Sequence, residues 1–235
     1  MIDKKEINII PQLNISDIFV ILSIDNEKEK FYDLFEKDGD LKIAGAFLID
    51  LANFGKIQII NNKIYVKNPN PIGDQILDLA FNIIKSYKKP KSSRKFFYKI
   101  STKELFQELF ELILNKLKIY GIIEYQKVIK HHKFIKYYFK GRFSKNFILK
   151  KIEVDIRNSI LNELLNILLN DKEPDMKYYC LLCLLSVDEM YKVFIEKNNY
   201  KKVKERINIL ISNEIIIKII QREINSRHAN VPVVT

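Results

Sequence analysis

Glycine and proline are scarce in this sequence, and that scarcity constrains the fold more than any other feature. Only six of each occur among 235 residues, too few for the many tight turns of an all-β chain. The second half is dominated by Leu, Ile, Lys and Glu, a composition that builds helices. We therefore predict a mainly α protein, with a central helical bundle surrounded by amphipathic helices and two short β-hairpins.

Apolar residues recur at steps of three and four in many stretches of the chain, which predicts helices there. The expected helices are 15–24, 41–54, 76–84, 101–120, 153–169, 175–185, 189–195 and 200–224. We expect Ser16-Asp17 to cap the first helix, Asp74 to cap the third, and Ser101 to form a capping box with Glu104.

The two hairpins are predicted from short β-branched runs that flank turn residues. Strands 56–60 and 63–67 enclose Asn61-Asn62, a pair that tolerates the positive φ angles of a tight turn. A second hairpin is expected over 122–143, and a basic loop over 86–93. Gly55 and Gly121 should end the helices that precede the two hairpins.

Composition predicts one domain over 1–228, with 229–235 as a frayed tail that begins next to His228. Cys180 and Cys183 are interpreted as two small apolar residues on a buried helix. His131 and His132 are adjacent, so in a strand they point to opposite faces and cannot chelate one ion together.

No H-E-x-x-H, P-loop or G-x-S-x-G motif occurs, so the sequence predicts neither an enzyme nor a metal site nor a cofactor. The first residues lack the apolar core of a signal peptide, and no apolar run is long enough to cross a bilayer. We expect a cytoplasmic protein that is peripheral on a membrane.

Charge placement is the most informative functional signal. Lys and Arg number 40 against 29 Asp and Glu, a net charge of +11. Between Tyr125 and Ile152 there is no acidic residue, yet aromatic residues alternate with nine cations. These cations are Lys127, Lys130, Lys133, Lys136, Lys140, Arg142, Lys145, Lys150 and Lys151. Such a hairpin would bind an acidic partner.

Three kinds of acidic partner remain open on charge alone. An anionic membrane surface would attract the lysines, and an apolar hairpin tip would strengthen binding. Nucleic acid could use the same cations and stack its bases on the aromatic rings, but no RRM, KH or helix-turn-helix signature appears. A module that binds only other proteins is the third alternative, and self-association into a homo-oligomer also stays open.

Two blocks of sequence resemble a known family. Residues 43–57 read IAGAFLIDLANFGKI, and 70–74 read NPIGD, followed by ILD at 76–78. These blocks resemble the Golgi phosphoprotein 3 family, in which a small-residue helix ends at Gly-Arg/Lys and a hairpin leads to a Pro-Thr-Gly-Asp turn. Residues 116–122 and 173–185 are similar to later helices of that family.

The resemblance implies a mainly helical adaptor that binds phosphatidylinositol 4-phosphate and retains glycosyltransferases in the Golgi by their cytoplasmic tails. It implies an aromatic headgroup contact at Phe35, and it places the family's three phosphate-binding arginines at Ala44, Gln107 and Phe110. Lysines are the expected substitutes for the arginines. The predicted headgroup residues are therefore Phe35, Lys42, Lys127 and Lys130, and the predicted membrane-facing residues are Lys133, Lys136, Lys140 and Arg142.

Overall fold

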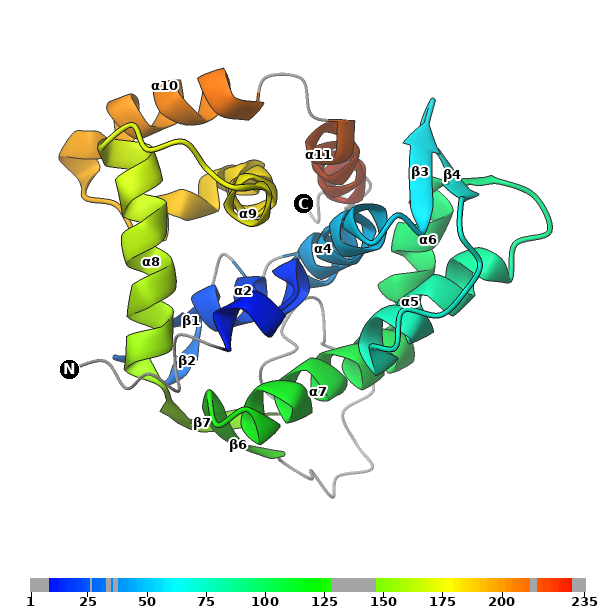
Figure 1. Cartoon of the computed structure of the whole chain (residues 1–235), viewed down its shortest axis with the longest axis horizontal. Coiled ribbons are helices and arrows are strands. Elements are labelled where there is room, and N and C mark those ends of the chain that lie inside the picture. Colours follow the sequence, from blue (N-terminus) through cyan, green and yellow to red (C-terminus); the bar gives the residue numbers. More distant parts are fainter. Residues whose placement is uncertain are drawn as a thin grey trace, which may run out of the picture.

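The fold is described from a computed structural model that covers residues 9–25, 27–32, 35, 38–127, 147–211 and 215–229. Within these residues most of the chain is helical, and the strands form small antiparallel sheets (Figure 1). The predicted mainly α class is confirmed.

The elements follow one another along the chain as in Figure 1. The helices are η1 Ile10–Gln12, α2 Ile15–Leu22, α4 Gly39–Asn53, α5 Gln75–Lys85, α6 Ser93–Ile100, α7 Lys103–Ile119, α8 Val154–Leu169, α9 Met176–Ser186, η3 Val187–Val193, η4 Lys197–Asn199, α10 Tyr200–Ile211 and α11 Ile215–Ala229. The strands are β1 Ile24–Asp25, β2 Lys30–Phe31, β3 Ile57–Ile60, β4 Lys63–Val66, β5 Lys91–Ser92, β6 Ile123–Lys127 and β7 Phe147–Ile152.

Helices α2 and α4 form the centre of the bundle. Every residue of α2 is buried, and so is α4 from Gly39 to Leu51. Helices α5 to α7 pack on one side of this pair, and α8 to α10 lie on the other (Figure 1). Helix α11 packs against α4, η3 and α6. The central helices therefore read as apolar almost throughout, whereas outer helices such as α5 bury one face only.

The glycine that ends α4 does so by a Schellman motif. Gly55 has a φ angle of +64°, and its N–H donates to the carbonyl of Ala52. The N–H of Lys56 donates to the carbonyl of Leu51 at 2.9 Å. This pattern satisfies carbonyls that the helix end would leave without partners. Gly121 ends α7 in the same way, so both predicted helix ends are confirmed.

The first predicted hairpin is confirmed, but it belongs to a larger sheet. Asn61 and Asn62 have φ angles of 48° and 63°, as a tight turn between β3 and β4 requires. Strand β5 then pairs with β4, so that Ile64 lies opposite Lys91. Since β5 lies within 86–93, the prediction of a plain loop there was wrong.

Several other local predictions were wrong because tertiary contacts decide the outcome. Strands β1 and β2 pair with each other, so Ile24, the predicted last residue of the first helix, lies in a strand. Helix α6 was not predicted. Asn14, rather than Ser16-Asp17, is the N-cap of α2, and Thr102, rather than Ser101, precedes α7.

The C-terminal third also differs from the prediction. The expected helix 200–224 is two helices, α10 and α11, which point in different directions (Figure 1). His228 lies in α11 with its Nε2 2.8 Å from Asp38 Oδ2, and α11 extends to Ala229, the first residue of the predicted tail. Residues 230–235, the rest of the predicted tail, lie outside the described residues.

The return strand of the second hairpin comes later than predicted. Strand β6 pairs with β7, which begins at Phe147, beyond residue 143 where the predicted hairpin ends. The predicted turn at 130–133 lies outside the described residues.

A close contact between α4 and α11 yields a test of the packing. A Cβ atom at Gly45 would lie 2.3 Å from Cδ1 and 2.7 Å from Cγ1 of Ile220, which is fully buried. We expect Gly45→Ala to lower the free energy of unfolding by about 1–3 kcal/mol through overpacking. In an Ile220→Ala background the same change should be neutral or stabilising, because the clash is gone and Ala favours helix.

Urea denaturation of the four proteins in this double-mutant cycle measures the coupling. Strictly additive effects would show that α11 does not pack on Gly45.

Candidate functional site

The root of the basic hairpin is fixed to the body of the protein. Strand β6 pairs with β7 from Ile123–Ile152 to Lys127–Phe147, with a register shift between Glu124 and Tyr125. The Tyr125 hydroxyl lies 2.7 Å from Asn115 Oδ1 on α7. The N–H of Glu153 donates to the carbonyl of Ile122 at 2.7 Å. The two ends of the acid-free segment are therefore held side by side against α7.

Most of the predicted basic residues of this hairpin are not part of the described structure. Lys127 is the last residue of β6, opposite Phe147. Lys130, Lys133, Lys136, Lys140 and Arg142 lie outside the described residues.

Phe35, the predicted aromatic headgroup contact, lies in the protein core. It is 2% exposed, and its ring centroid lies 5.2 Å from that of Phe31 and 5.6 Å from that of Phe19. The ring of Phe110 follows at 6.1 Å and in turn stacks on Phe106. Such ring clusters stabilise a core through burial and favourable ring geometry. A headgroup in solvent cannot reach Phe35 in this arrangement.

Lys42, the predicted cationic contact on α4, is also buried. Its Nζ lies 3.2 Å from Asp188 Oδ2, and the lysine side chain has no exposed surface. Asp188 and Glu189 both have φ angles of 54°, a left-handed conformation that is strained for residues other than glycine. The buried ion pair helps to hold η3 in this conformation. Lys42 thus acts as an internal partner for η3.

The resemblance places the family's headgroup contacts at four positions of this chain, and two of them are neighbours in space. Phe35 and Phe110 contact each other, Ala44 is fully buried, and Gln107 is half-buried. In this chain aromatic rings and a methyl group occupy three of the four positions. None of these four side chains carries a positive charge.

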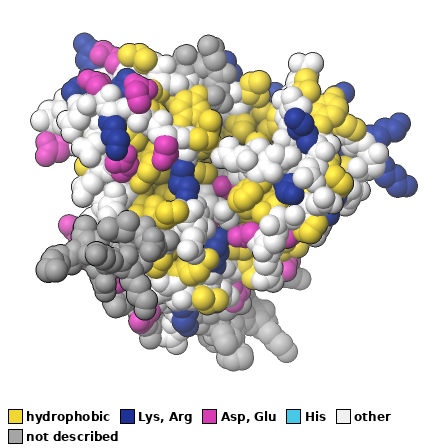
Figure 2. Space-filling model, viewed as in Figure 1, with side chains coloured by type: hydrophobic (Ala, Val, Ile, Leu, Met, Phe, Trp, Pro, Cys, Tyr) yellow, Lys and Arg dark blue, Asp and Glu magenta, His cyan; other side chains and the backbone are white. Residues whose placement is uncertain are grey.

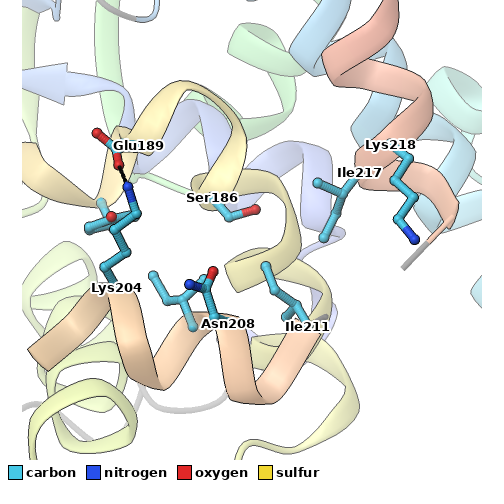
Figure 3. A pocket seen from close by; sticks show the side chains of 9 residues that line it. Ser186, Glu189, Lys204, Asn208, Ile211, Ile217 and Lys218 are labelled. Atoms are coloured by element: carbon cyan, nitrogen blue, oxygen red, sulfur yellow. Dashed lines mark hydrogen bonds and ion pairs between the residues drawn. The ribbon is translucent and has the colours of Figure 1, made fainter. Parts of the chain in front are cut away.

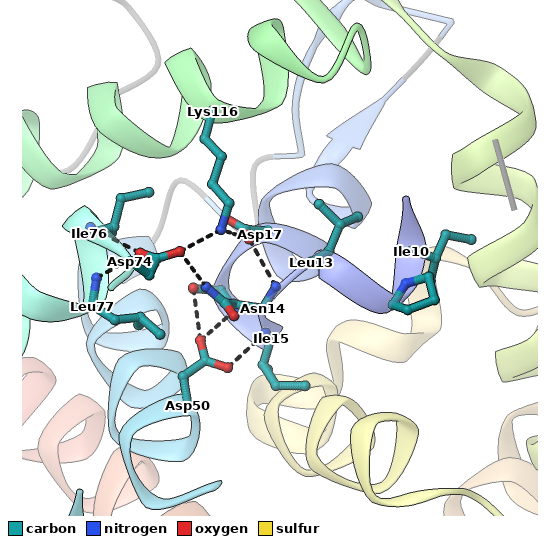
Figure 4. A network of polar contacts seen from close by, with 12 residues as sticks. Ile10, Leu13, Asn14, Ile15, Asp17, Asp50, Asp74, Ile76, Leu77 and Lys116 are labelled. Atoms are coloured by element: carbon teal, nitrogen blue, oxygen red, sulfur yellow. Dashed lines mark hydrogen bonds and ion pairs between the residues drawn. The ribbon is translucent and has the colours of Figure 1, made fainter. Parts of the chain in front are cut away.

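A buried polar network joins the helices of the centre (Figure 4). Lys116 on α7 places its Nζ 2.6 Å from Asp17 on α2 and 2.8 Å from Asp74 at the start of α5. The side-chain amide of Asn14 donates to Asp74, and the Asn14 N–H donates to Asp17. Asp74 also accepts from the N–H groups of Ile76 and Leu77, which confirms the predicted cap of α5.

The ionisation of this network follows from burial and from Lys116. Burial raises the pKa of Asp17 in spite of Lys116. Burial alone would raise the pKa of Asp74 too, but the hydrogen bond from Lys116 and the amide of Leu77 outweigh it, so that pKa is lowered. Both carboxylates raise the pKa of Lys116 against the opposing effect of burial. The network is therefore a structural junction in which one lysine serves two carboxylates.

Asp50 on α4 caps α2 from a different helix. Its carboxylate accepts from the N–H groups of Ile15 and Ser16 at 2.8 and 3.1 Å and from the Ser16 hydroxyl at 2.9 Å. It is 3% exposed, and burial raises its pKa to about 7. Asp50 thus changes its ionisation near neutral pH.

Two hollows border these elements. One of about 260 Å³ lies beside the network and is lined by Asp74, Ile76, Leu112, Asn115, Lys116 and Tyr120 among others. Another of about 270 Å³ lies between η3, α10 and α11, where Lys204 pairs with Glu189 at 2.8 Å (Figure 3). Its other lining residues include Ile207, Asn208, Ile211 and Ile217. In the first hollow Lys116 forms an ion pair with Asp74, and in the second Lys204 forms one with Glu189.

The structure reveals a second basic surface that the sequence reasoning missed. Residues 79–103 contain no Asp or Glu but eight Lys and Arg. They run from α5 through β5 to α6, beside the sheet β3–β4. Figure 2 shows Lys and Arg at the right-hand edge of the molecule, next to hydrophobic side chains over β3 and β4. The sequence shows that residues 79–103 lack acidic side chains, but it does not show that β5 pairs with β4.

The described residues hold neither a metal-binding cluster nor a membrane-spanning helix. No group of three or more His, Cys, Asp or Glu is placed to hold a metal ion there. Among the helices of that same part of the chain, none has the length and apolar character needed to span a membrane.

Comparison with known proteins gives one match. A family model described as Golgi phosphoprotein 3 matches residues 15–224. This range runs from the start of α2 into α11 and includes both basic segments. A search of curated proteins finds no match.

The raised pKa of Asp50 predicts how stability depends on pH. Because the pKa rises from 3.8 to about 7 on folding, the contribution is fully present below pH 4 and is lost as the pH rises through 7. We expect the free energy of unfolding to fall by about 1 kcal/mol between pH 6 and pH 8. Asp50→Asn should be less stable, since an amide accepts fewer of these hydrogen bonds, but should lose this pH dependence.

Urea denaturation at pH 6, 7 and 8 measures both effects. The same slope in the variant and in the unchanged protein would refute the assignment to Asp50.

Proposed function

Because the chain belongs to the Golgi phosphoprotein 3 family, we propose that it is a peripheral membrane adaptor that binds anionic lipid through a basic surface. The proposal assigns it no catalytic activity. In a eukaryotic cell the membrane would be that of the Golgi. The suggested lipid is phosphatidylinositol 4-phosphate, and the suggested clients are the cytoplasmic tails of glycosyltransferases.

The observation that supports this proposal most directly is the fixed root of the basic hairpin. Strands β6 and β7 hold both ends of the acid-free segment 125–152 against α7. A rigid root reduces the entropy lost when the segment binds a surface. The segment combines lysines with aromatic side chains, a composition suited to the interface of an anionic bilayer.

The expected strength fits reversible binding. Each Lys or Arg close to an anionic bilayer contributes about 1 kcal/mol, and the effect fades within about 8–10 Å at physiological salt. If roughly half of the nine cations face the lipid, they supply about 4 kcal/mol. Aromatic side chains that enter the interface would add to this value.

Lipid selectivity is the finer part of the proposal. Phe35 and Phe110 are buried rings, and Lys42 is paired with Asp188. Of the predicted headgroup residues, Lys127 and Lys130 therefore remain for a headgroup contact. Two lysines act as point charges and lack the forked geometry with which arginine grips a phosphate. We accordingly propose that overall negative charge contributes more to binding than the identity of the headgroup.

Co-sedimentation with vesicles at physiological salt tests the proposal. We would compare phosphatidylcholine vesicles with vesicles that carry phosphatidylserine or phosphatidylinositol 4-phosphate at matched total charge. Binding is expected to both acidic kinds and not to the neutral kind. Replacement of Lys127, Lys130, Lys133 and Lys136 by Gln should weaken binding at least about tenfold, because about 1 kcal/mol is lost per lysine that faces the lipid.

A matched control carries the same loss of charge elsewhere. Lys30, Lys197, Lys201 and Lys218 are exposed and lie outside both basic segments. Their replacement by Gln should leave binding nearly unchanged. Absence of binding to either acidic vesicle would overturn the membrane function. Retention of single-stranded nucleic acid with a steep salt dependence would then favour the alternative function.

A further inference from the structure

The second basic surface is built from two stretches of chain without acidic residues. Residues 51–73 contain three lysines and no Asp or Glu, and residues 79–103 contain eight Lys and Arg and no Asp or Glu. Asp74 and Asp78, the acids between them, are used internally. Asp74 contacts Lys116, and Asp78 accepts from the N–H groups of Ile72 and Gly73.

Sheet pairing brings the two stretches together. Strand β4 pairs with β5 so that Lys63 lies opposite Ser92. The N–H of Ser93 donates to the carbonyl of Asn62 at 3.0 Å, which joins the start of α6 to the β3–β4 turn. Lysines that are distant in sequence thus share one surface. The exposed lysines without an ion-pair partner in the described part of the chain include Lys63, Lys67, Lys88, Lys89 and Lys91.

One face of this sheet, formed by Gln58, Ile60, Lys63 and Tyr65, is open to solvent. Cross-strand partners point to the same face, so Ile60 lies beside Lys63, and Gln58 beside Tyr65. Ile60 is 43% exposed and Tyr65 36%. Val66, at the end of β4, pairs with the buried Ile57 on the opposite face and is 40% exposed. Exposed aliphatic and tyrosine side chains among lysines are typical of surfaces that lie in a bilayer interface.

A hollow opens next to these side chains. It has a volume of about 240 Å³ and lies between β4 and the turn that follows α5. Its lining includes Tyr65, Val66, Tyr87, Lys88 and Lys89. Lys88 and Lys89 at its rim are exposed and place positive charge beside the hollow.

From this geometry we propose that the face formed by β3, β4 and the 86–92 segment binds an anionic lipid surface, with a phosphate-bearing headgroup in the Tyr87–Lys88–Lys89 hollow. The proposal rests on the membrane function proposed above. Lys88 and Lys89 supply positive charge to the headgroup. Ile60 and Tyr65 enter the interface beside it.

The exposed apolar residues favour a bilayer over nucleic acid or an acidic protein segment. Nucleic acid binding would use the lysines but would leave Ile60 without a role, since it cannot stack on a base. A bilayer uses both kinds of side chain at once, because lysines contact headgroups while the apolar residues enter the layer below.

The absence of tryptophan from the sequence allows a direct test. In Ile60→Trp the single indole reports on this face alone, and in Ile209→Trp it reports on α10, where Ile209 is 72% exposed. We expect vesicles of phosphatidylcholine with phosphatidylserine to shift the emission of the first variant to the blue and brominated lipid to quench it. The second variant should show neither effect.

Charge is tested separately. Replacement of Lys88, Lys89 and Lys91 by Gln should weaken vesicle binding about tenfold, an effect of the size expected for lysines near an anionic bilayer. Replacement of Lys30, Lys197 and Lys201 by Gln is the matched control and should not weaken it. Thermal unfolding monitored by circular dichroism checks that each variant is folded.

The outcomes separate this proposal from the membrane function on which it rests. If the protein sediments with acidic vesicles but the indole emission of the Ile60→Trp variant does not change, this face is not the lipid contact, and the membrane function stands. If the protein does not sediment at all, both proposals fail. If the emission of the Ile60→Trp variant shifts to the blue while the Lys88, Lys89 and Lys91 variant binds vesicles as well as its control, the hollow is not part of the site.

Discussion

The amide groups at the start of α2 need hydrogen-bond acceptors in the interior of the protein. The arrangement of the central helices depends on the side chains that supply these acceptors. Helix α2 is buried along its whole length, so water cannot serve its first turn. Asp50 reaches across from α4 and Asp17 from within α2, while Lys116 joins Asp17 to Asp74 at the start of α5. Removal of any of these partners would leave a buried charge or amide unsatisfied.

Local geometry could be predicted from the sequence where one residue type is required. The ends of two helices at Gly55 and Gly121 and the turn at Asn61-Asn62 were predicted for this reason, since each needs positive φ angles. Long-range pairing could not be predicted. The cap that Asp50 provides for α2 comes from 35 residues away along the chain, and β5 exists only because β4 is beside it.

The same difference in range explains what was predicted of the candidate site. The acid-free segment 125–152 and its aromatic residues are visible in one reading of the sequence. Counting along the family resemblance selected both Phe35 and Phe110, and these two rings do lie against each other. Periodicity and counting could not show that Phe35 is a core ring or that Lys42 is the partner of Asp188. Burial depends on which helices cover a position, and that is decided by the whole fold.

Helix α11 covers α4, and this has a consequence for synthesis on the ribosome. Asp38 and Asp40 at the start of α4 are buried, and both lie against Arg227 of α11. Ile220 fills the space over Gly45. Until α11 leaves the exit tunnel, a nascent chain would expose the apolar face of α4 around Gly45. The two carboxylates at the start of α4 would also lack their partner. The central helix can therefore complete its packing only after about 190 further residues have been translated, an interval in which a chaperone would find a binding site.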